Sequence, residues 1–174
     1  MPGDRKKRAQ ERHVRLRASI WNDEEFVSLP MASQWLYMLI ISQPGVTLCG
    51  VVQPAFKRWA TFAPDTTADG IEKAALTLQE RFFIEIDDTT DELLVRSFVR
   101  HGVALDSDNA IVGMAKSFET IHSKVLRKVV LEELRKDLDH DLDHRIARTI
   151  PEGEKPSLRS RLSRTFVGAW EGPS

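Results

Sequence analysis

The fold is decided by residues 71–99, which read IEKAALTLQERFFIEIDDTTDELLVRSFV. Apolar residues in the first part of this stretch recur at helical spacing, at Ile71, Ala74, Ala75, Leu78 and Phe82. This stripe predicts an amphipathic helix, which Thr66 or Thr67 is expected to cap. From Phe82 the period changes to two, and a polar run at 88–91 separates strands expected over 82–87 and 92–99. Two strands around a short polar turn predict a β-hairpin.

Three further elements are expected before this stretch. Pro30 suits the first turn of a helix over residues 30–42, because a first-turn proline loses no hydrogen bond. The β-branched, apolar run at 46–52 predicts a short strand, and residues 55–62 predict a second helix that Pro64 closes.

A short capped turn of helix is expected near residue 23, where Asn22 or Asp23 can act as the cap. The two aromatic residues that flank this turn, Trp21 and Phe26, are both expected to enter the core.

The expected order is therefore helix, strand, helix, helix and hairpin, which is typical of a winged helix-turn-helix, a fold that mostly binds nucleic acid. The sequence predicts an α+β protein, mainly α-helical with a small β-hairpin. The winged helix-turn-helix domain is expected over 19–102. A basic arm at 1–18 precedes it, a helical extension at 103–150 follows it, and a basic tail closes the chain at 151–174.

The extension has an apolar spacing that resembles heptads, at Ile111, Met114, Phe118, Ile121 and Val125. The spacing slips after Val125, so the pattern falls short of a sustained coiled coil. We expect a helix or helix pair that packs on the domain or on a second copy. The second alternative would make residues 107–146 a homodimer interface.

The net charge of −1 conceals a strong asymmetry along the chain. Residues 1–17 carry seven Lys/Arg and two acids, a net of +5, and residues 155–170 carry four Lys/Arg and no acid. Glu171 adds −1, so residues 18–154 must sum to −9. Basic ends on an acidic body are expected to contact phosphate, although charged tails also serve solubility alone.

Double-stranded DNA is the expected partner, and the candidate contacts are cations of the arm and cations or polar residues of the second helix, the third helix and the second hairpin strand. These candidates are Arg5, Lys6, Lys7, Arg8, Arg12, Arg15, Arg17, Lys57, Arg58, Lys73, Thr77, Arg81, Arg96 and Arg100. Trp59, beside Lys57 and Arg58, is expected in the core.

Acidic residues oppose this interpretation at two places. The outward positions of the third helix include Asp69, Glu72 and Glu80, and the hairpin turn carries acids at 87, 88, 91 and 92. Carboxylates repel phosphates, so these surfaces are alternatively a solvated face or a contact with another protein.

Other function classes are disfavoured. Glycine-rich phosphate loops, nucleophile elbows and paired cysteines are absent from the sequence. His140 and His144 share a helical face, but without a further ligand we predict no metal and no cofactor. No apolar run is long enough to span a membrane, and no secretory signal is evident. Cys49, the one cysteine, is expected to be a buried, reduced thiol of a cytoplasmic protein.

A family resemblance is carried by four runs: RASIWNDEEF at 17–26, LP at 29–30 with WLYML at 35–39, LLVRSFVRH at 93–101, and AIVGMAKSF at 110–118 with IH at 121–122. The first three resemble the N-terminal winged-helix domain of bacteriophage replication-initiation or replisome-organiser proteins. The last resembles the segment that follows this domain in helix-turn-helix DNA-binding proteins of actinobacterial phages. The resemblance covers about residues 15–135.

This resemblance implies a phage-encoded, non-catalytic DNA-binding protein of the host bacterial cytoplasm, acting in replication initiation or transcriptional regulation. It also implies a winged helix that often oligomerises. The alternative is a protein-interaction adaptor whose acidic winged helix binds a host or phage protein, such as a replication protein.

Overall fold

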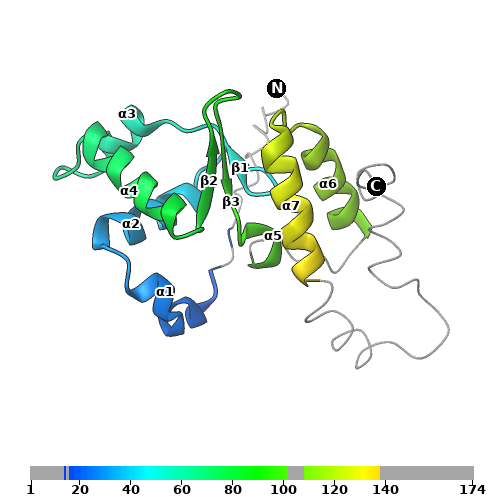
Figure 1. Ribbon diagram of the computed structural model, residues 1–174, viewed down its shortest axis with the longest axis horizontal. Coiled ribbons are helices and arrows are strands. Elements are labelled where there is room, and N and C mark those ends of the chain that lie inside the picture. The colour runs from blue at the N-terminus through cyan, green and yellow to red at the C-terminus, as the bar shows by residue number, and fades with distance from the viewer. Residues whose placement is uncertain (1–13, 15, 102–107, 138–174) are drawn as a thin grey trace, which may run out of the picture.

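The computed structural model describes residue 14, residues 16–101 and residues 108–137. These residues are mainly α-helical with a small three-stranded antiparallel sheet, as the sequence predicted (Figure 1). The elements in chain order are η1 Ala18–Asn22, α1 Glu24–Val27, α2 Met31–Ile41, β1 Val51–Val52, α3 Phe56–Trp59, η2 Ala60–Phe62, α4 Ala68–Glu80, β2 Ile84–Asp87, β3 Glu92–Val95, α5 Phe98–His101, α6 Asp108–Glu119 and α7 Lys124–Asp137.

Strand β3 is the centre of the sheet, whose order is β1-β3-β2. All four residues of β3 are buried, because both faces of the sheet are covered by helices. Leu93 and Val95 face a core shared with α1, α2, α3 and α4, whereas Leu94 faces a second core shared with α6 and α7. The described chain is therefore a three-layer sandwich in which the sheet separates two helical layers (Figure 1).

The first core forms around helix α4, as its stripe predicts. Ile71, Ala74, Ala75 and Leu78 are buried, and the side chain of Thr67 caps the helix by accepting a hydrogen bond from the Gly70 amide at 3.1 Å. The expected helix 30–42 is present as α2, and 55–62 forms α3 followed by the 3-10 turn η2. Trp59 is wholly buried, which agrees with its expected core role.

The end of α4 differs from the prediction. Phe82 is 70% exposed and has a left-handed backbone with φ of 59°, so it belongs neither to the helix stripe nor to the strand. The chain turns here because the Phe83 amide bonds the Leu78 carbonyl at 2.9 Å and closes the last turn of the helix. Phe83, rather than Phe82, packs against the first core, where its ring lies edge-on to the rings of Phe26 and Tyr37.

The strand expected at 46–52 is reduced to Val51–Val52. A tight turn precedes it, because the Gly50 amide bonds the Thr47 carbonyl at 3.0 Å and Gly50 has a φ of 80°. This turn places Cys49 against α6, where its thiol lies 3.5 Å from the Met114 carbonyl. Burial raises the pKa of the Cys49 thiol to about 11, so the buried thiol is protonated and chemically quiet.

Two further expectations are wrong. The returning strand ends at Val95 rather than Val99, and Phe98–His101 is helix α5, which directs Phe98 into the first core and Val99 into the second. Asp23 caps α1 and Phe26 is buried, but Trp21 is 58% exposed and meets the edge of Phe26 from outside at 5.7 Å.

The extension is a helix pair, with a break between α6 and α7 at residues 120–123. Arg127 closes the end of α6 by donating to the carbonyls of Ile121 at 2.7 Å and Glu119 at 2.9 Å. Met114, Phe118, Leu126 and other apolar residues of the pair form the second core with β1 and β3. Packing of the extension on the domain is thus confirmed for 108–137, and pairing with a second copy stays a prediction.

None of the helices in the described ranges is long and apolar enough to cross a membrane.

Candidate nucleic-acid interface

The outward face of α4 is the first candidate surface, since the third helix was expected to meet DNA. Along its solvent side run Asp69, Lys73, Leu76 and Glu80, with Glu72 beside them. Lys73 is held by Asp69 in an i, i+4 ion pair at 2.8 Å, which leaves the acids in excess. Thr77 donates its hydroxyl to the Lys73 carbonyl at 3.1 Å. This face offers a phosphate little attraction.

The hairpin turn is the second candidate surface, and it is acidic as the sequence indicated. Asp91 accepts a hydrogen bond from the Gln53 side chain at 2.8 Å, and Asp88 is exposed. The Ser123 side chain, followed by the Thr89 amide, lowers the pKa of Asp87 by hydrogen bonding. Carboxylates at this turn would repel a DNA backbone.

Glu92 was expected at the hairpin tip, but its structural role is different. Its carboxylate is buried at the start of α7 and accepts hydrogen bonds from the amides of His122 at 3.0 Å and Ser123 at 2.7 Å. Burial of Glu92 tends to raise its pKa, but the hydrogen bonds to its carboxylate, with those from the two amides the strongest, together lower the pKa. Glu92 therefore joins the hairpin to the α6–α7 layer.

Two predicted cations of α3, Lys57 and Arg58, are exposed. The Arg58 guanidinium lies 3.5 Å from the Gln43 side-chain oxygen, so Gln43 helps to orient it. Arg81, just after α4, is also exposed. These three side chains can reach a phosphate.

Arg96 cannot serve as a phosphate contact. Its side chain is only 16% exposed and forms ion pairs with Glu133 at 3.3 Å and Glu85 at 3.7 Å. Its guanidinium also lies 5.6 Å from the centre of the Phe82 ring. The main partner, Glu133, is on α7, and no local pattern in the sequence indicated this pairing.

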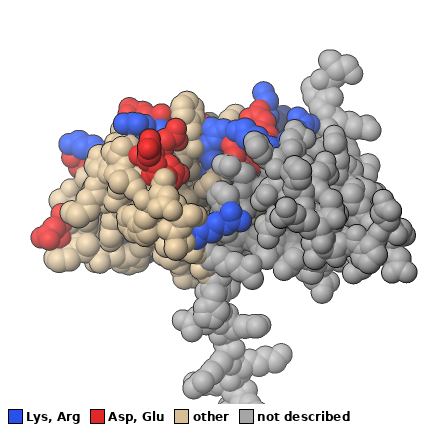
Figure 2. Space-filling model, turned by 90° about the horizontal axis from the view of Figure 1, so that it is seen from below, with Lys and Arg blue, Asp and Glu red and all other residues tan. Residues whose placement is uncertain are grey.

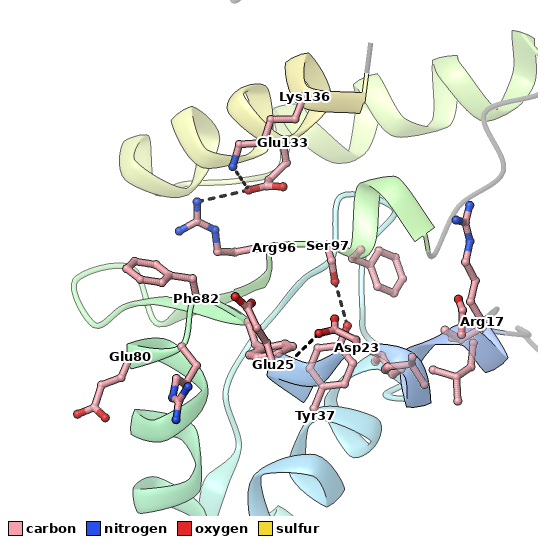
Figure 3. Close-up of a pocket in the computed structure, with 18 residues that line it drawn as sticks. Arg17, Asp23, Glu25, Tyr37, Glu80, Phe82, Arg96, Ser97, Glu133 and Lys136 are labelled. Carbon is pink, nitrogen blue, oxygen red and sulfur yellow. Dashed lines mark hydrogen bonds and ion pairs between the residues drawn. The ribbon is translucent and has the colours of Figure 1, made fainter. Parts of the chain in front are cut away.

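Beneath Arg96 is a cavity of about 620 Å³ that the sequence did not predict. Figure 3 shows its labelled charged side chains coming from the two ends of η1, from α1 and α4, from the segment after β3 and from α7. Four cations and four acids line it: Arg17, Arg81, Arg96 and Lys136, with Asp23, Glu25, Glu80 and Glu133. Because the charges balance, the cavity as a whole favours neither an anion nor a cation.

Basic residues that the sequence reasoning did not select lie on the second helical layer. Lys116 of α6 and Lys124, Lys128 and Arg135 of α7 are exposed. The signal was available, because residues 124–136 contain five Lys/Arg at helical spacing. On the face drawn in Figure 2, basic and acidic side chains lie close together over the described residues.

Several predicted residues lie outside the described ranges. They are Arg5, Lys6, Lys7, Arg8, Arg12 and Arg15 of the arm, the side chain of Arg100, and the pair His140 and His144. Within the described ranges no three His, Cys, Asp or Glu side chains are grouped to hold a metal ion.

Comparison of the chain with known protein families, with curated proteins and with solved structures finds no match. The resemblance to phage winged-helix proteins therefore stays a prediction.

Proposed function

We propose that this protein is a non-catalytic, winged-helix DNA-binding protein. One observation carries the proposal: the order α2, β1, α3, α4, β2, β3 combined with the sheet order β1-β3-β2. That connectivity, with α4 packed against α2 and α3 on one face of the sheet, is the one a winged helix has. The resemblance to phage replication-initiation proteins supplies the setting, with transcriptional regulation as the other role.

Charge limits how such a protein can hold DNA. Residues 18–101 contain six Lys/Arg and twelve Asp/Glu, a net of −6. The acidic face of α4 and the acidic hairpin turn cannot supply phosphate affinity. In this proposal the basic arm supplies most of it, with Lys57 and Arg58 of α3 as additional contacts. Binding held this way is strongly salt-dependent and depends weakly on sequence.

We expect the full chain to bind a random DNA duplex at about 50 mM salt and to lose most of its affinity at about 200 mM. Fluorescence anisotropy of a labelled duplex measures this directly. If each of the seven arm cations neutralises one phosphate, deletion of residues 1–17 lowers the slope of log affinity against log salt by roughly 6. Affinity that survives the deletion would instead assign binding to the folded domain. No binding of the full chain at the lower salt would refute the proposed function.

A second candidate function, a protein-interaction adaptor, is favoured by the outward face of α4. Leu76 is 57% exposed at the middle of that face, between Glu72 and Glu80 one turn away on either side and beside Lys73. An exposed leucine with an acidic rim suits a basic, partly apolar protein partner better than it suits DNA.

Leu76→Glu tests this second candidate, because it adds a charge at the centre of the face without touching the core. We expect a partner recovered from a bacterial lysate by the wild-type chain to be lost with the Leu76→Glu chain. Thermal unfolding checks that the variant is folded. We expect its free energy of unfolding to differ from that of the wild type by less than about 0.5 kcal/mol, because the site is exposed. Equal recovery by both chains would remove α4 as the contact surface.

A further inference from the structure

Phe82 occupies a position that helices usually give to glycine. It follows the end of α4 with a left-handed φ of 59°, and its amide donates to the Gln79 carbonyl at 3.0 Å. Helices that end in this way commonly use glycine here, because a bulky side chain strains a left-handed backbone. Asp91, the other non-glycine residue with a positive φ in the described ranges, lies in the hairpin turn, where aspartate is common. The strain at Phe82 is therefore not explained by its turn.

The core does not explain the phenylalanine either. Phe82 is 70% exposed, because Phe83 is the residue that packs against the first core. The Arg96 guanidinium lies 5.6 Å from the centre of the Phe82 ring, and Arg96 is itself held by Glu85 and Glu133. The exposed ring thus rests on a fixed cation. Backbone strain that is maintained in this way is concentrated at functional sites, so Phe82 marks a candidate ligand site.

The cavity beneath Arg96 has the size and the walls of such a site. Phe82 lines it, and its volume of about 620 Å³ is within the range of about 300 to 1,000 Å³ of small-molecule sites. Phe83 and Ile41, which pack in or against the first core, also line it. Figure 3 shows Phe82 and Arg17 on opposite sides of the cavity. An aromatic ring, an apolar wall and charged groups therefore border one space.

The charges of the cavity indicate what it can hold. Some are already paired, since Glu133 binds Arg96 and Lys136, and Asp23 accepts the amides at the start of α1. Two cations and two acids remain, all of them exposed, and no ion pair joins them to one another or to other residues in the described ranges. They are Arg17, Arg81, Glu25 and Glu80. Equal numbers of cations and acids suit a ligand that carries both charges and has no net charge.

We propose that this cavity binds a free aromatic amino acid in its zwitterionic form. The aromatic side chain packs on the exposed ring of Phe82, as aromatic pairs do. The carboxylate pairs with Arg17 or Arg81, and the ammonium pairs with Glu25 or Glu80, through charge-assisted hydrogen bonds. A nucleotide fits less well, because its net negative charge would lie near the two acids. The inference goes beyond the proposed function, and its test needs no DNA.

Isothermal titration calorimetry of the full chain with L-phenylalanine tests the site. Two analogues are the ligand controls: phenethylamine lacks the carboxylate, and 3-phenylpropanoate lacks the ammonium. We expect saturable binding of L-phenylalanine and at least about tenfold weaker binding of each analogue, because each loses one charge-assisted contact. The inference is wrong if L-phenylalanine does not bind, or if either analogue binds as tightly. Both outcomes leave the proposed function untouched.

Phe82→Gly tests the role of the ring. We expect L-phenylalanine to bind this variant at least about tenfold more weakly. The thermal midpoint of unfolding should not fall, because glycine adopts the left-handed φ without strain. Leu76→Ala, which shortens an exposed side chain outside the lining of the cavity, is the control and should bind within about twofold of the wild type. Undiminished binding by Phe82→Gly, or equal weakening by Leu76→Ala, would overturn the inference.

Arg17→Gln/Arg81→Gln keeps the test decisive if Phe82→Gly does not fold. This variant removes the two cations that the carboxylate needs, so L-phenylalanine should bind at least about tenfold more weakly. Phenethylamine has no carboxylate, and we expect its affinity to stay within about twofold of its affinity for the wild type. Equal weakening of both ligands would contradict a carboxylate contact and overturn the inference.

Discussion

Gly50→Ala is expected to lower the free energy of unfolding by about 2 to 5 kcal/mol, the sum of two separate costs. Gly50 has a φ of 80°, and an L-residue there costs about 1 to 2 kcal/mol. A Cβ at this position would lie 2.5 Å from the Phe98 Cβ and 3.0 Å from the Val95 carbonyl oxygen. Both are main-chain or near-main-chain atoms that cannot rotate away, so overpacking adds about 1 to 3 kcal/mol.

Urea unfolding followed by circular dichroism measures this effect. Gly45→Ala is the matched control, because nothing lies within 4 Å of its added Cβ and its backbone is not left-handed. We expect the control to stay within about 0.5 kcal/mol of the wild type. A Gly50→Ala variant as stable as the control would show that the β1 turn and α5 do not approach as closely as described.

The effect matters beyond one turn, because Gly50 stands where the two cores meet. Its carbonyl accepts the Val95 amide at 2.9 Å, which fastens β1 to the end of β3. Its neighbours Cys49 and Val51 face the second core, whereas Val52 and Phe98 face the first. Displacing Phe98 therefore disturbs the packing of both helical layers.

Local patterns made part of this fold predictable. Helix α4 has its apolar stripe and its threonine cap within one stretch of sequence, and each of these acts over three or four residues. The hairpin turn is local in the same way. Such elements can be read from one segment, and the α+β class follows from their order.

The missed features depend on contacts between distant residues. Nothing near Phe82 indicates that Phe83 fills the core instead, since that choice is made by the turn that closes α4 and by the packing of Phe83 on Phe26 and Tyr37. Strand β3 was expected to continue to Val99, but α5 turns Phe98 and Val99 into different cores. The apolar pattern of residues 92–99 fits a strand that continues to Val99 and a strand that is followed by a helix equally well.

Two charged residues, Arg96 and Glu92, were misassigned for the same reason. Arg96 looked like a phosphate contact, yet it pairs with Glu133, 37 residues later. Glu92 looked like a hairpin-tip acid, yet it holds amides 30 and 31 residues later. The type and the position of a charged residue do not indicate its partner. Both roles depend on how the helical extension packs on the domain, which no local pattern predicts.

Glu92→Gln is expected to lower the free energy of unfolding at pH 7 by about 2 kcal/mol. The wild-type carboxylate accepts hydrogen bonds from the amides of His122 and Ser123 at the first turn of α7, where the helix dipole favours negative charge. Hydrogen bonds to a charged acceptor contribute about 1.5 to 3 kcal/mol. The neutral side-chain amide of the glutamine keeps one oxygen as a weaker acceptor, so part of this contribution remains. Asp88→Asn, in the exposed hairpin turn, is the control and should change stability by less than about 0.5 kcal/mol.

The pH dependence gives this prediction a sign. Because the pKa of Glu92 is lower in the folded protein than its ordinary value of 4.5, the folded state binds fewer protons than the unfolded state. The stabilisation from the carboxylate is therefore complete above about pH 4.5 and is lost as the pH falls through the folded pKa. Asp87 has a lowered pKa too, but it is present in both proteins, so the difference between wild type and Glu92→Gln reports the Glu92 carboxylate together with its 3.4 Å contact to the His122 ring. Urea unfolding at several pH values should show that difference shrinking below about pH 4.5. A difference independent of pH would mean that the side chain acts through packing, and the ionic capping of α7 by the hairpin would then be wrong.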